Sequence, residues 1–307
     1  MSYHIINIDA PNCSVSVNRG QLICRTIGEG EKSLPIEDVA AIIITSFSAQ
    51  IHSKLLVESA KHGVALVICD QFNPVSLLLP ANRSSDTLLT KAELNLDKKK
   101  QNSLWRKTID AKCRNQYALA DYLVPEFERI DRLKLQAMGK AQHKESTCAQ
   151  YYWRAWGQAI DDVEFKRHSP LNASNKLLNY GYAVLLSTVL QKLFACGLDP
   201  TFGISHAVRE RSTPLAYDLM EPFRPCVDWR VAQWVIDYCE PGQEVEITRE
   251  FKQWVTGFVL ESVGYFQIEM TINNCIESVI RSFRNAVLKQ SVREYKPWTP
   301  QNLKWAG

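Results

Sequence analysis

The spacing of hydrophobic residues changes near residue 85, and the change predicts two kinds of secondary structure. Before this point, short apolar runs rich in Val and Ile are separated by polar turn residues, which is the pattern of β-strands. A strand is expected in each of these runs, at 4–8, 14–17, 21–24, 39–45, 64–68 and 75–79. The turn signal Asn18-Arg19-Gly20 predicts a hairpin between the second and third strands, and 50–61 has the apolar stripe of a helix.

Beyond residue 85, apolar residues recur with the period of a helix, and strand signals are few. The segment 86–122 is expected to be helical, either continuously or with one break. Further helices are expected at 142–156, at 173–196, from 213, from 229, and at 248–287. Thr213 and Pro214 form an N-cap followed by a first-turn proline, and Pro222 is predicted to interrupt the helix that they begin.

The change of period also predicts the domain organisation. Residues 80–85 are small, polar or proline, which is typical of a linker. The predicted fold class is therefore α+β, with a small β-rich N-terminal domain at 1–85 and a larger all-α domain at 86–307. The length of 307 residues and the hydrophobic fraction of 46% are sufficient for two such cores.

The composition excludes several classes of protein. A charged fraction of 22% argues against intrinsic disorder. Nine cysteines, none of them in a CxxC pair, fit a reducing compartment better than a disulfide framework or a zinc knuckle. No secretion signal is recognisable at the N-terminus, and the most apolar stretch, 182–190, is too short to span a membrane. A cytoplasmic protein without membrane contact is expected.

The net charge of +3 is too small to indicate a nucleic-acid partner by itself. The charge is uneven, however, at −1 for residues 1–85 and +4 for the rest, so a surface for polyanions is expected in the second part. Lys and Arg are concentrated in 91–114 and 281–296. These segments are interpreted either as phosphate-binding tracks or as solvated helix faces.

Asp218 and Glu221 form the first candidate for chemistry, because residues at i and i+3 share one face of a helix. Two buried carboxylates this close require a cation, whereas two exposed ones would be an ordinary acidic turn. Their neighbours favour burial, since Leu215, Leu219 and other apolar residues surround the pair.

Two other residues have the right chemistry to complete such a site. His206 ends a loop rich in glycine and proline, 197–206, where it is either a metal ligand or an ordinary loop histidine. Glu145 lies on the apolar stripe of the helix predicted at 142–156. A carboxylate there indicates a partner or a metal, or else a helix N-terminal charge favoured by the macrodipole.

Four segments together resemble a known family. Glu145 to Trp153 resembles the motif E-G-x-A-A-x-x-Y-W, although Ser146 and Cys148 replace a glycine and an alanine. Residues 171–185 are similar to the family's central buried helix, and 197–206 to G-L-D-P-x-x-G-x-x-H. Residues 214–225 resemble P-L-x-x-D-L-M-E-P-F-R-P almost letter for letter. The family is that of the CRISPR spacer-acquisition integrase and endonuclease, the Cas protein numbered first.

The resemblance implies a fold, an assembly and a site. It implies a β-sandwich-like N-terminal dimerisation domain and a helical catalytic domain. It also implies a homodimer, joined to a second dimer by a small ferredoxin-like partner, with prespacer and CRISPR repeat DNA as substrates and effector-module proteins as further contacts. By position, the metal ligands would be Glu145, His206 and Glu221, with Asp218 as a catalytic acid beside the metal.

The expected reaction follows from this ligand set. Two carboxylates and one imidazole suit Mg²⁺ or Mn²⁺ better than zinc. Such an ion can polarise a phosphodiester for attack by the 3′-hydroxyl of the spacer, and one phosphodiester replaces another, so no nucleotide cofactor is needed. Arg209, Arg211 and Arg224 lie near the acids in sequence and are expected to contact phosphate, or to pair with a carboxylate.

Two other functions use the same residues. A structure-specific, metal-dependent DNA nuclease without integration would have the same site. A non-catalytic DNA-binding scaffold would contain the acidic cluster for structural reasons only. Strand transfer from a free 3′-OH donor separates the first of these from an integrase, and a metal titration separates the second.

Overall fold

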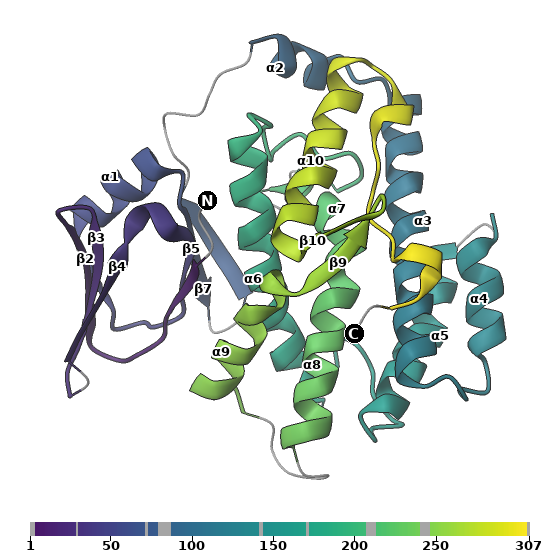
Figure 1. Ribbon diagram of the computed structural model, residues 1–307, viewed down its shortest axis with the longest axis horizontal. Coiled ribbons are helices and arrows are strands. Elements are labelled where there is room, and N and C mark those ends of the chain that lie inside the picture. Colours follow the sequence, from purple (N-terminus) through teal and green to yellow (C-terminus); the bar gives the residue numbers. More distant parts are fainter. Residues whose placement is uncertain are drawn as a thin grey trace.

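The computed structural model describes residues 4–28, 30–70, 73–78, 87–140, 144–169, 172–206, 213–239 and 246–305. Strands lie at the N-terminal end of the molecule, and helices make up most of the remainder (Figure 1). This arrangement confirms the predicted α+β class. The predicted linker at 80–85 lies outside the described residues.

The N-terminal strands form two four-stranded sheets. In the first, the order is β1-β5-β7-β8, with bounds His4–Ile8, Val39–Ile44, Ala65–Asp70 and Asn73–Leu78. Strands β1, β5 and β7 are parallel, and β8 returns antiparallel beside β7. The continuous apolar run predicted as a buried strand is the inner strand β5, where Ile42 and Ile43 have no exposed surface.

The second sheet has the order β4-β3-β2-β6, with bounds Gly30–Pro35, Gln21–Thr26, Cys13–Asn18 and Gln50–Ile51. The predicted hairpin is present, because β2 and β3 pair antiparallel across Arg19 and Gly20. Strand β4 was not predicted, because its sequence GEKSLP is polar and most of its residues are exposed. Both sheets and helix α1 (Ser53–His62) contribute to one apolar core, which includes Val15, Leu22, Ile42, Leu55 and Leu66.

Helix α6 (Ser174–Ala195) is apolar on all sides and buried along most of its length. The other helices are α2 (Thr87–Leu94), α3 (Lys98–Leu123), α4 (Ile130–Met138), α5 (Lys144–Ala159), α7 (Pro214–Met220), α8 (Arg224–Tyr238), α9 (Arg249–Thr256) and α10 (Ile272–Leu288). Helix α4 was not predicted. The break between α2 and α3 is fixed by Asp97, whose side chain accepts a hydrogen bond from the backbone N–H of Lys100.

One predicted helix is wrong. The segment 248–287 is divided into α9, a 3₁₀ turn, an antiparallel hairpin of β9 (Ser262–Tyr265) and β10 (Ile268–Thr271), and α10. Phe266 and Gln267 adopt positive φ at the hairpin turn, and Thr271 caps α10 by accepting from the N–H of Asn274. The second domain is therefore not purely helical.

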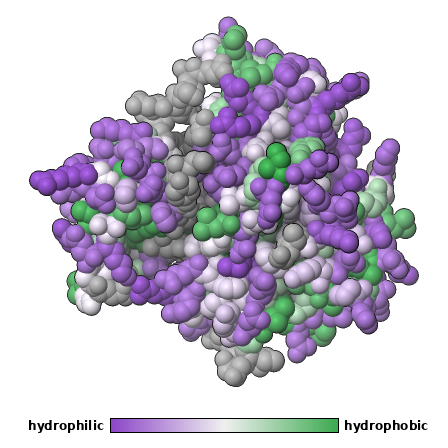
Figure 2. Space-filling model, in the orientation of Figure 1, coloured by the Kyte–Doolittle hydropathy of each residue, from purple (hydrophilic) through white to green (hydrophobic). Residues whose placement is uncertain are grey.

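The two parts of the molecule share apolar contacts. Ile43, Val67 and Cys69 of the first sheet belong to the same buried cluster as the helices, and α6 contacts β5, β7 and β8. On the face shown in Figure 2, hydrophilic residues predominate and hydrophobic ones form separate small patches. Within the described residues, no helix has the length and apolar character needed to cross a bilayer, and no cysteine is in a disulfide.

Candidate active site

Asp218 and Glu221 lie where one helix gives way to another. Pro214 begins α7, and Pro222 lies in the 3₁₀ turn of Glu221–Phe223 that separates α7 from α8. Asp218 is 0% exposed and Glu221 is 4% exposed. The alternative interpretation, an exposed acidic turn, is therefore wrong. Both carboxylates need compensation from nearby donors or cations.

Glu221 is compensated by two cations. Arg224 Nε donates to its Oε1 at 2.7 Å, and Lys112 Nζ, from the middle of α3, lies 2.7 Å from its Oε2. Burial by itself would raise the pKa of Glu221, but the charges of Arg224 and Lys112 outweigh burial and lower the pKa to about 2. Glu221 is therefore a carboxylate at any physiological pH.

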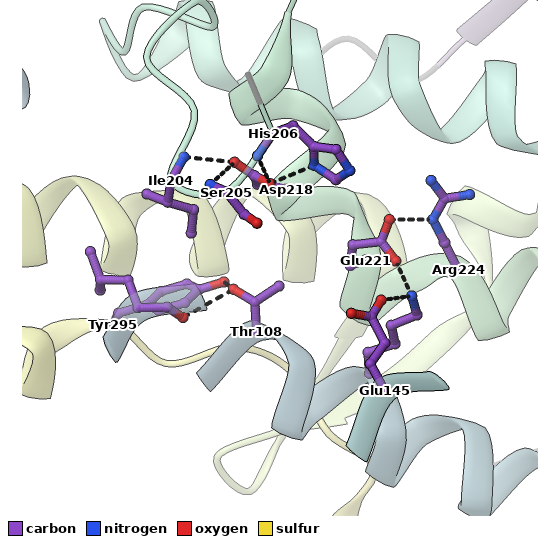
Figure 3. Close-up of polar contacts among 11 residues, drawn as sticks. Thr108, Glu145, Ile204, Ser205, His206, Asp218, Glu221, Arg224 and Tyr295 are labelled. Atoms are coloured by element: carbon purple, nitrogen blue, oxygen red, sulfur yellow. Dashed lines mark hydrogen bonds and ion pairs between the residues drawn. The ribbon is translucent and has the colours of Figure 1, made fainter. Parts of the chain in front are cut away.

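The same ammonium also holds Glu145. Lys112 Nζ donates to Glu145 Oε1 at 2.7 Å, so it bridges the first turn of α5 and the turn that follows α7. In Figure 3 the carboxylates of Glu145 and Glu221 point toward this one cation. The side chain of Glu145 is 41% exposed, while that of Lys112 is 13% exposed, so the bridge is open to solvent on the Glu145 side.

Asp218 organises the histidine loop. Its Oδ2 accepts from the backbone N–H groups of Ile204 at 2.7 Å and Ser205 at 3.0 Å, and its Oδ1 lies 2.7 Å from His206 Nδ1 (Figure 3). The close approach needs glycine at position 203, because a Cβ there would lie 2.5 Å from the His206 carbonyl oxygen. The hydrogen bond from the imidazole to Asp218 raises the pKa of His206.

The three acids and the imidazole are thus arranged as two neighbouring groups. Glu145 and Glu221 share Lys112, and His206 is bound to Asp218. Among the described residues, no three His, Cys, Asp or Glu side chains form a group that could hold a metal ion. The ligand set expected from the sequence is not assembled in this arrangement, because the Lys112 ammonium forms ion pairs with both glutamates and Asp218 binds Nδ1 of the imidazole.

The donor set nevertheless fits a hard divalent cation. Glu145 and Glu221 already converge on one positive charge, and carboxylate oxygens are the ligands that Mg²⁺ and Mn²⁺ favour. With Nδ1 bound to Asp218, Nε2 is the atom of His206 that remains for coordination. A carboxylate on the other ring nitrogen is the usual support of a metal-binding histidine. The negative charge of Glu221 also contributes to the raised pKa of His206, so the two groups interact.

The ring of His206 is enclosed by other side chains. The ring of Trp105 meets it edge to face, with centroids 5.8 Å apart. On another side, His206 lines a cavity of about 290 Å³ together with Glu93, Gln101 and Thr201. Burial raises the pKa of Glu93 to about 7. The imidazole therefore contacts the Trp105 ring and also borders this cavity.

Sequence reasoning missed Lys112 and Asp228. Lys112 lies in the basic segment 91–114, which was interpreted as a phosphate track or a solvated face, and only the fold reveals its carboxylate partners. Asp228 is buried and accepts hydrogen bonds from Tyr152 at 2.6 Å and Tyr182 at 2.5 Å. The guanidinium of Arg224 lies over the ring of Tyr182, at 4.6 Å from its centroid, so Asp228 supports the arginine that holds Glu221.

The expected phosphate contacts have different outcomes. Arg209 and Arg211 lie outside the described residues. Arg224 pairs with Glu221, which was the alternative considered for it. In the second basic segment, Arg281 pairs with Glu277 and Lys289 with Glu294, so part of that charge is neutralised on the surface.

A clamp from the C-terminal segment supports the turn that carries Glu221. The side-chain amide of Asn115, on α3, donates to the carbonyl of Pro222 at 2.6 Å and to that of Trp298 at 3.1 Å. The rings of Phe223 and Trp298 stack with an interplanar angle of 6° and centroids 5.7 Å apart. The clamp of Asn115, Phe223 and Trp298 therefore joins three distant stretches of sequence at the 3₁₀ turn.

Comparisons with known proteins agree with one another. A family model described as CRISPR associated protein Cas1 matches residues 6–238. The CRISPR-associated endonuclease Cas1 of Neisseria meningitidis serogroup C is 30% identical over 288 residues, covering 92% of this chain and 91% of that protein.

Solved structures share the fold. A casposase bound to its integration product matches with a TM-score of 0.78 at 22% identity, covering 96% of this chain and 95% of the other. A Cas6-RT-Cas1–Cas2 complex matches with a TM-score of 0.75 at 14% identity, covering 96% of this chain and 36% of the other. At these identities the likeness concerns the fold alone.

Proposed function

Since the chain belongs to the Cas1 family of CRISPR-associated proteins, we propose that it is the integrase of CRISPR adaptation. In this proposal it is a metal-dependent DNA endonuclease and transesterase, and it joins the 3′-OH ends of spacer DNA to the CRISPR repeat. The convergence of Glu145 and Glu221 on a single cation, beside a histidine held by a buried aspartate, is the observation that carries the proposal.

Glu145, His206 and Glu221 would hold the ion. Mg²⁺ or Mn²⁺ bound there would supply positive charge to the phosphodiester under attack and to the entering and leaving oxygens. Glu221 is ionised at the working pH because its pKa is about 2. Asp218 fixes the ring of His206 through Nδ1, and Arg224 fixes Glu221 through Oε1, so both ligands are oriented before DNA arrives.

The proposal extends to substrates and partners. We propose that DNA reaches the site from the cavity beside His206 and from the solvent-exposed side of Glu145. Arg209, Arg211 and the outer part of the Arg224 guanidinium are proposed phosphate contacts. A cytoplasmic homodimer, bridged to another dimer by a small ferredoxin-like partner, is also proposed, and the fold shared with a chain of a Cas1–Cas2 assembly supports it.

The first test is strand transfer in the presence of Mn²⁺. A labelled duplex with free 3′-OH ends is incubated with supercoiled plasmid that carries a CRISPR repeat, and joined products are separated by electrophoresis. E221A is expected to abolish joining, because it removes a ligand at the buried end of the site, while its affinity for DNA in a mobility-shift assay stays near that of the wild type.

The matched control is D237A, which removes an exposed carboxylate from α8 and should leave joining unchanged. Full joining by E221A would refute the assignment of the site. Plasmid nicking without joined product would indicate the nuclease without integration. DNA binding with no Mn²⁺-dependent product of any kind would indicate the scaffold.

A further inference from the structure

Lys112 is the residue whose position the expected chemistry does not explain. Its ammonium lies 2.7 Å from Glu145 Oε1 and 2.7 Å from Glu221 Oε2, between the two carboxylates that are proposed to hold a metal. We propose that Lys112 is a tethered competitor of the divalent ion, and that its ammonium must leave these two oxygens before the ion binds. This inference rests on the proposed function.

Geometry makes the two cations mutually exclusive. A Mg²⁺ ion lies about 2.0–2.1 Å from its oxygen ligands, and Nζ lies 2.7 Å from each of the two oxygens, so an ion held by these oxygens would lie within about 5 Å of the ammonium. Repulsion between an ammonium and a divalent ion at such a distance is severe inside a protein. One of the two positive charges has to move, and Lys112 is the one on a flexible side chain.

The arrangement of Glu221 shows which oxygens would be exchanged. Arg224 holds Oε1, and Lys112 holds Oε2. Withdrawal of Lys112 therefore frees Oε2 of Glu221 together with Oε1 of Glu145, while Arg224 keeps Glu221 in place. The Lys112 ammonium would move toward solvent on the side of Glu145, which is the most exposed of these side chains.

Lys112 also has a reason to be there. Glu221 is buried, and without Lys112 its only remaining ion pair among the described residues would be with Arg224, while the charge of Glu145 would lie nearby without compensation. Leaving a buried charge without its partner is strongly destabilising. The lysine therefore keeps the two carboxylates together and lowers the apparent affinity for metal. A monovalent ion gains nothing over the ammonium, whereas a divalent ion does, so the competition favours divalent cations.

The test measures Mn²⁺ binding directly, by the loss of the electron paramagnetic resonance signal of free Mn²⁺, and needs neither DNA nor turnover. K112M removes the charge and keeps the length of the side chain, so it is expected to bind Mn²⁺ about tenfold more tightly than the wild type, or better. K112R retains a cation and should bind no more tightly than the wild type. K99M is the matched control, because it removes an exposed lysine from the same helix and should leave the affinity unchanged.

Thermal unfolding gives a second readout. Without Mn²⁺, K112M should unfold at a lower temperature than the wild type, and Mn²⁺ should raise its unfolding temperature by more than it raises that of the wild type. K112Q is used in the same way if K112M does not fold. Binding by K112M alone, with none by the wild type, would support the competition in its strongest form.

Two results overturn the inference, and they have different meanings. Equal or weaker Mn²⁺ binding by K112M and K112Q, with normal binding by the wild type that E221A abolishes, would refute the competition and leave the proposed function intact. No Mn²⁺ binding by the wild type, K112M or K112Q would refute both, because the carboxylates would then have no role as metal ligands.

Discussion

Asp218 illustrates how much of the site is determined by a single buried group. Its two oxygens accept backbone N–H groups from consecutive residues of the histidine loop and also hold the imidazole. It is completely buried, so each of these hydrogen bonds replaces one that water would otherwise make. Asp218 is therefore both the anchor of the loop and the main cause of the raised pKa of His206.

Replacement of Asp218 by Asn should lower the pKa of His206. An amide can still accept from the loop, but it lacks the charge that stabilises the imidazolium. Because the pKa of His206 is raised in the folded protein, the ion pair stabilises the fold fully at pH below about 6.5, the unfolded value, and this contribution is lost as pH rises through the folded pKa. Nuclear magnetic resonance titration of the ring protons without metal measures it, and an unchanged pKa in D218N would contradict the assignment.

Asp228 leads to a second pH prediction, in which burial and not a charged partner raises the pKa. Burial raises its pKa to about 6, although Tyr152 and Tyr182 donate to it. The folded protein therefore holds this proton more tightly than the unfolded chain, whose Asp has a pKa of about 3.9. The contribution to stability is complete below that value and is lost as pH rises through about 6.

D228N keeps the shape and removes this ionisation. The free energy of unfolding of the wild type, relative to that of D228N, should fall as pH is raised from about 4 to about 6. Urea denaturation at several pH values measures the difference, and the comparison cancels the titration of all other groups. A difference that is constant or grows over this range would show that Asp228 is ionised at the lower pH.

At the residue scale, the sequence motifs led to the proposed ligand residues but not to the residues that hold them in place. Glu145, His206, Asp218 and Glu221 stand in segments whose spacing indicates chemistry. Lys112 meets its two carboxylates across 33 and 109 positions of the chain, and no local pattern marks such a contact. In the sequence, Lys112 cannot be distinguished from the exposed lysines of the same basic segment.

At the scale of elements, the hydrophobic pattern predicted elements with one buried face, such as α1, and fully buried elements, such as β5 and α6, but it missed α4. It failed for β4, whose residues are mostly exposed, and for the β9–β10 hairpin, which lies between two amphipathic helices with no break in apolar content. A mostly exposed strand has no apolar pattern that would reveal it. The turn at Phe266 and Gln267 carries neither the Gly nor the Asn that usually marks a hairpin.

Gly181 lies at the contact between α6 and α8. A Cβ at this position would lie 2.4 Å from Cγ1 of Val227 and 3.3 Å from Cγ2 of Val255. G181A should therefore destabilise the protein by about 1–3 kcal/mol, although alanine favours helices, because the two helices would have to separate. Chemical denaturation measures the loss.

The double variant G181A/V227A checks the cause. Removing the valine methyl groups makes room for the new Cβ, so the double variant should be less destabilised than the sum of the two single variants. Strict additivity would mean that the cost of G181A does not come from this contact.

At the scale of the whole molecule, the N-terminal sheets share part of their buried surface with the helices. Ile43, Val67 and Cys69 are buried against the helices, and an ion pair of Lys252 with Asp9 at 2.8 Å joins α9 to the strands. The change of hydrophobic period near residue 85 predicted two domains, but it could not show that one face of the first sheet completes the core of the second part. A sheet face is apolar whether it packs within its own domain or against a second one, so the sequence does not distinguish these two cases.

A fragment that begins at residue 87 should therefore not behave as a folded domain. It would expose the side of α6 that β5, β7 and β8 cover. We expect it to aggregate or to bind a hydrophobic dye strongly, in light scattering and fluorescence measurements made beside the full chain. A monodisperse fragment with a sharp thermal transition would contradict this expectation.

The clamp at the 3₁₀ turn has a consequence for the way the protein matures. A chain emerges from the ribosome starting at its N-terminus, so Trp298 becomes available only after every proposed ligand residue has been made. Until then, Asn115 has only half of its carbonyl partners, and Phe223 has no ring to stack on. A nascent chain that has not yet reached Trp298 would carry all the proposed ligand residues on an unsupported turn, so under the proposed function we expect it to be inactive until the segment that contains Trp298 has been made.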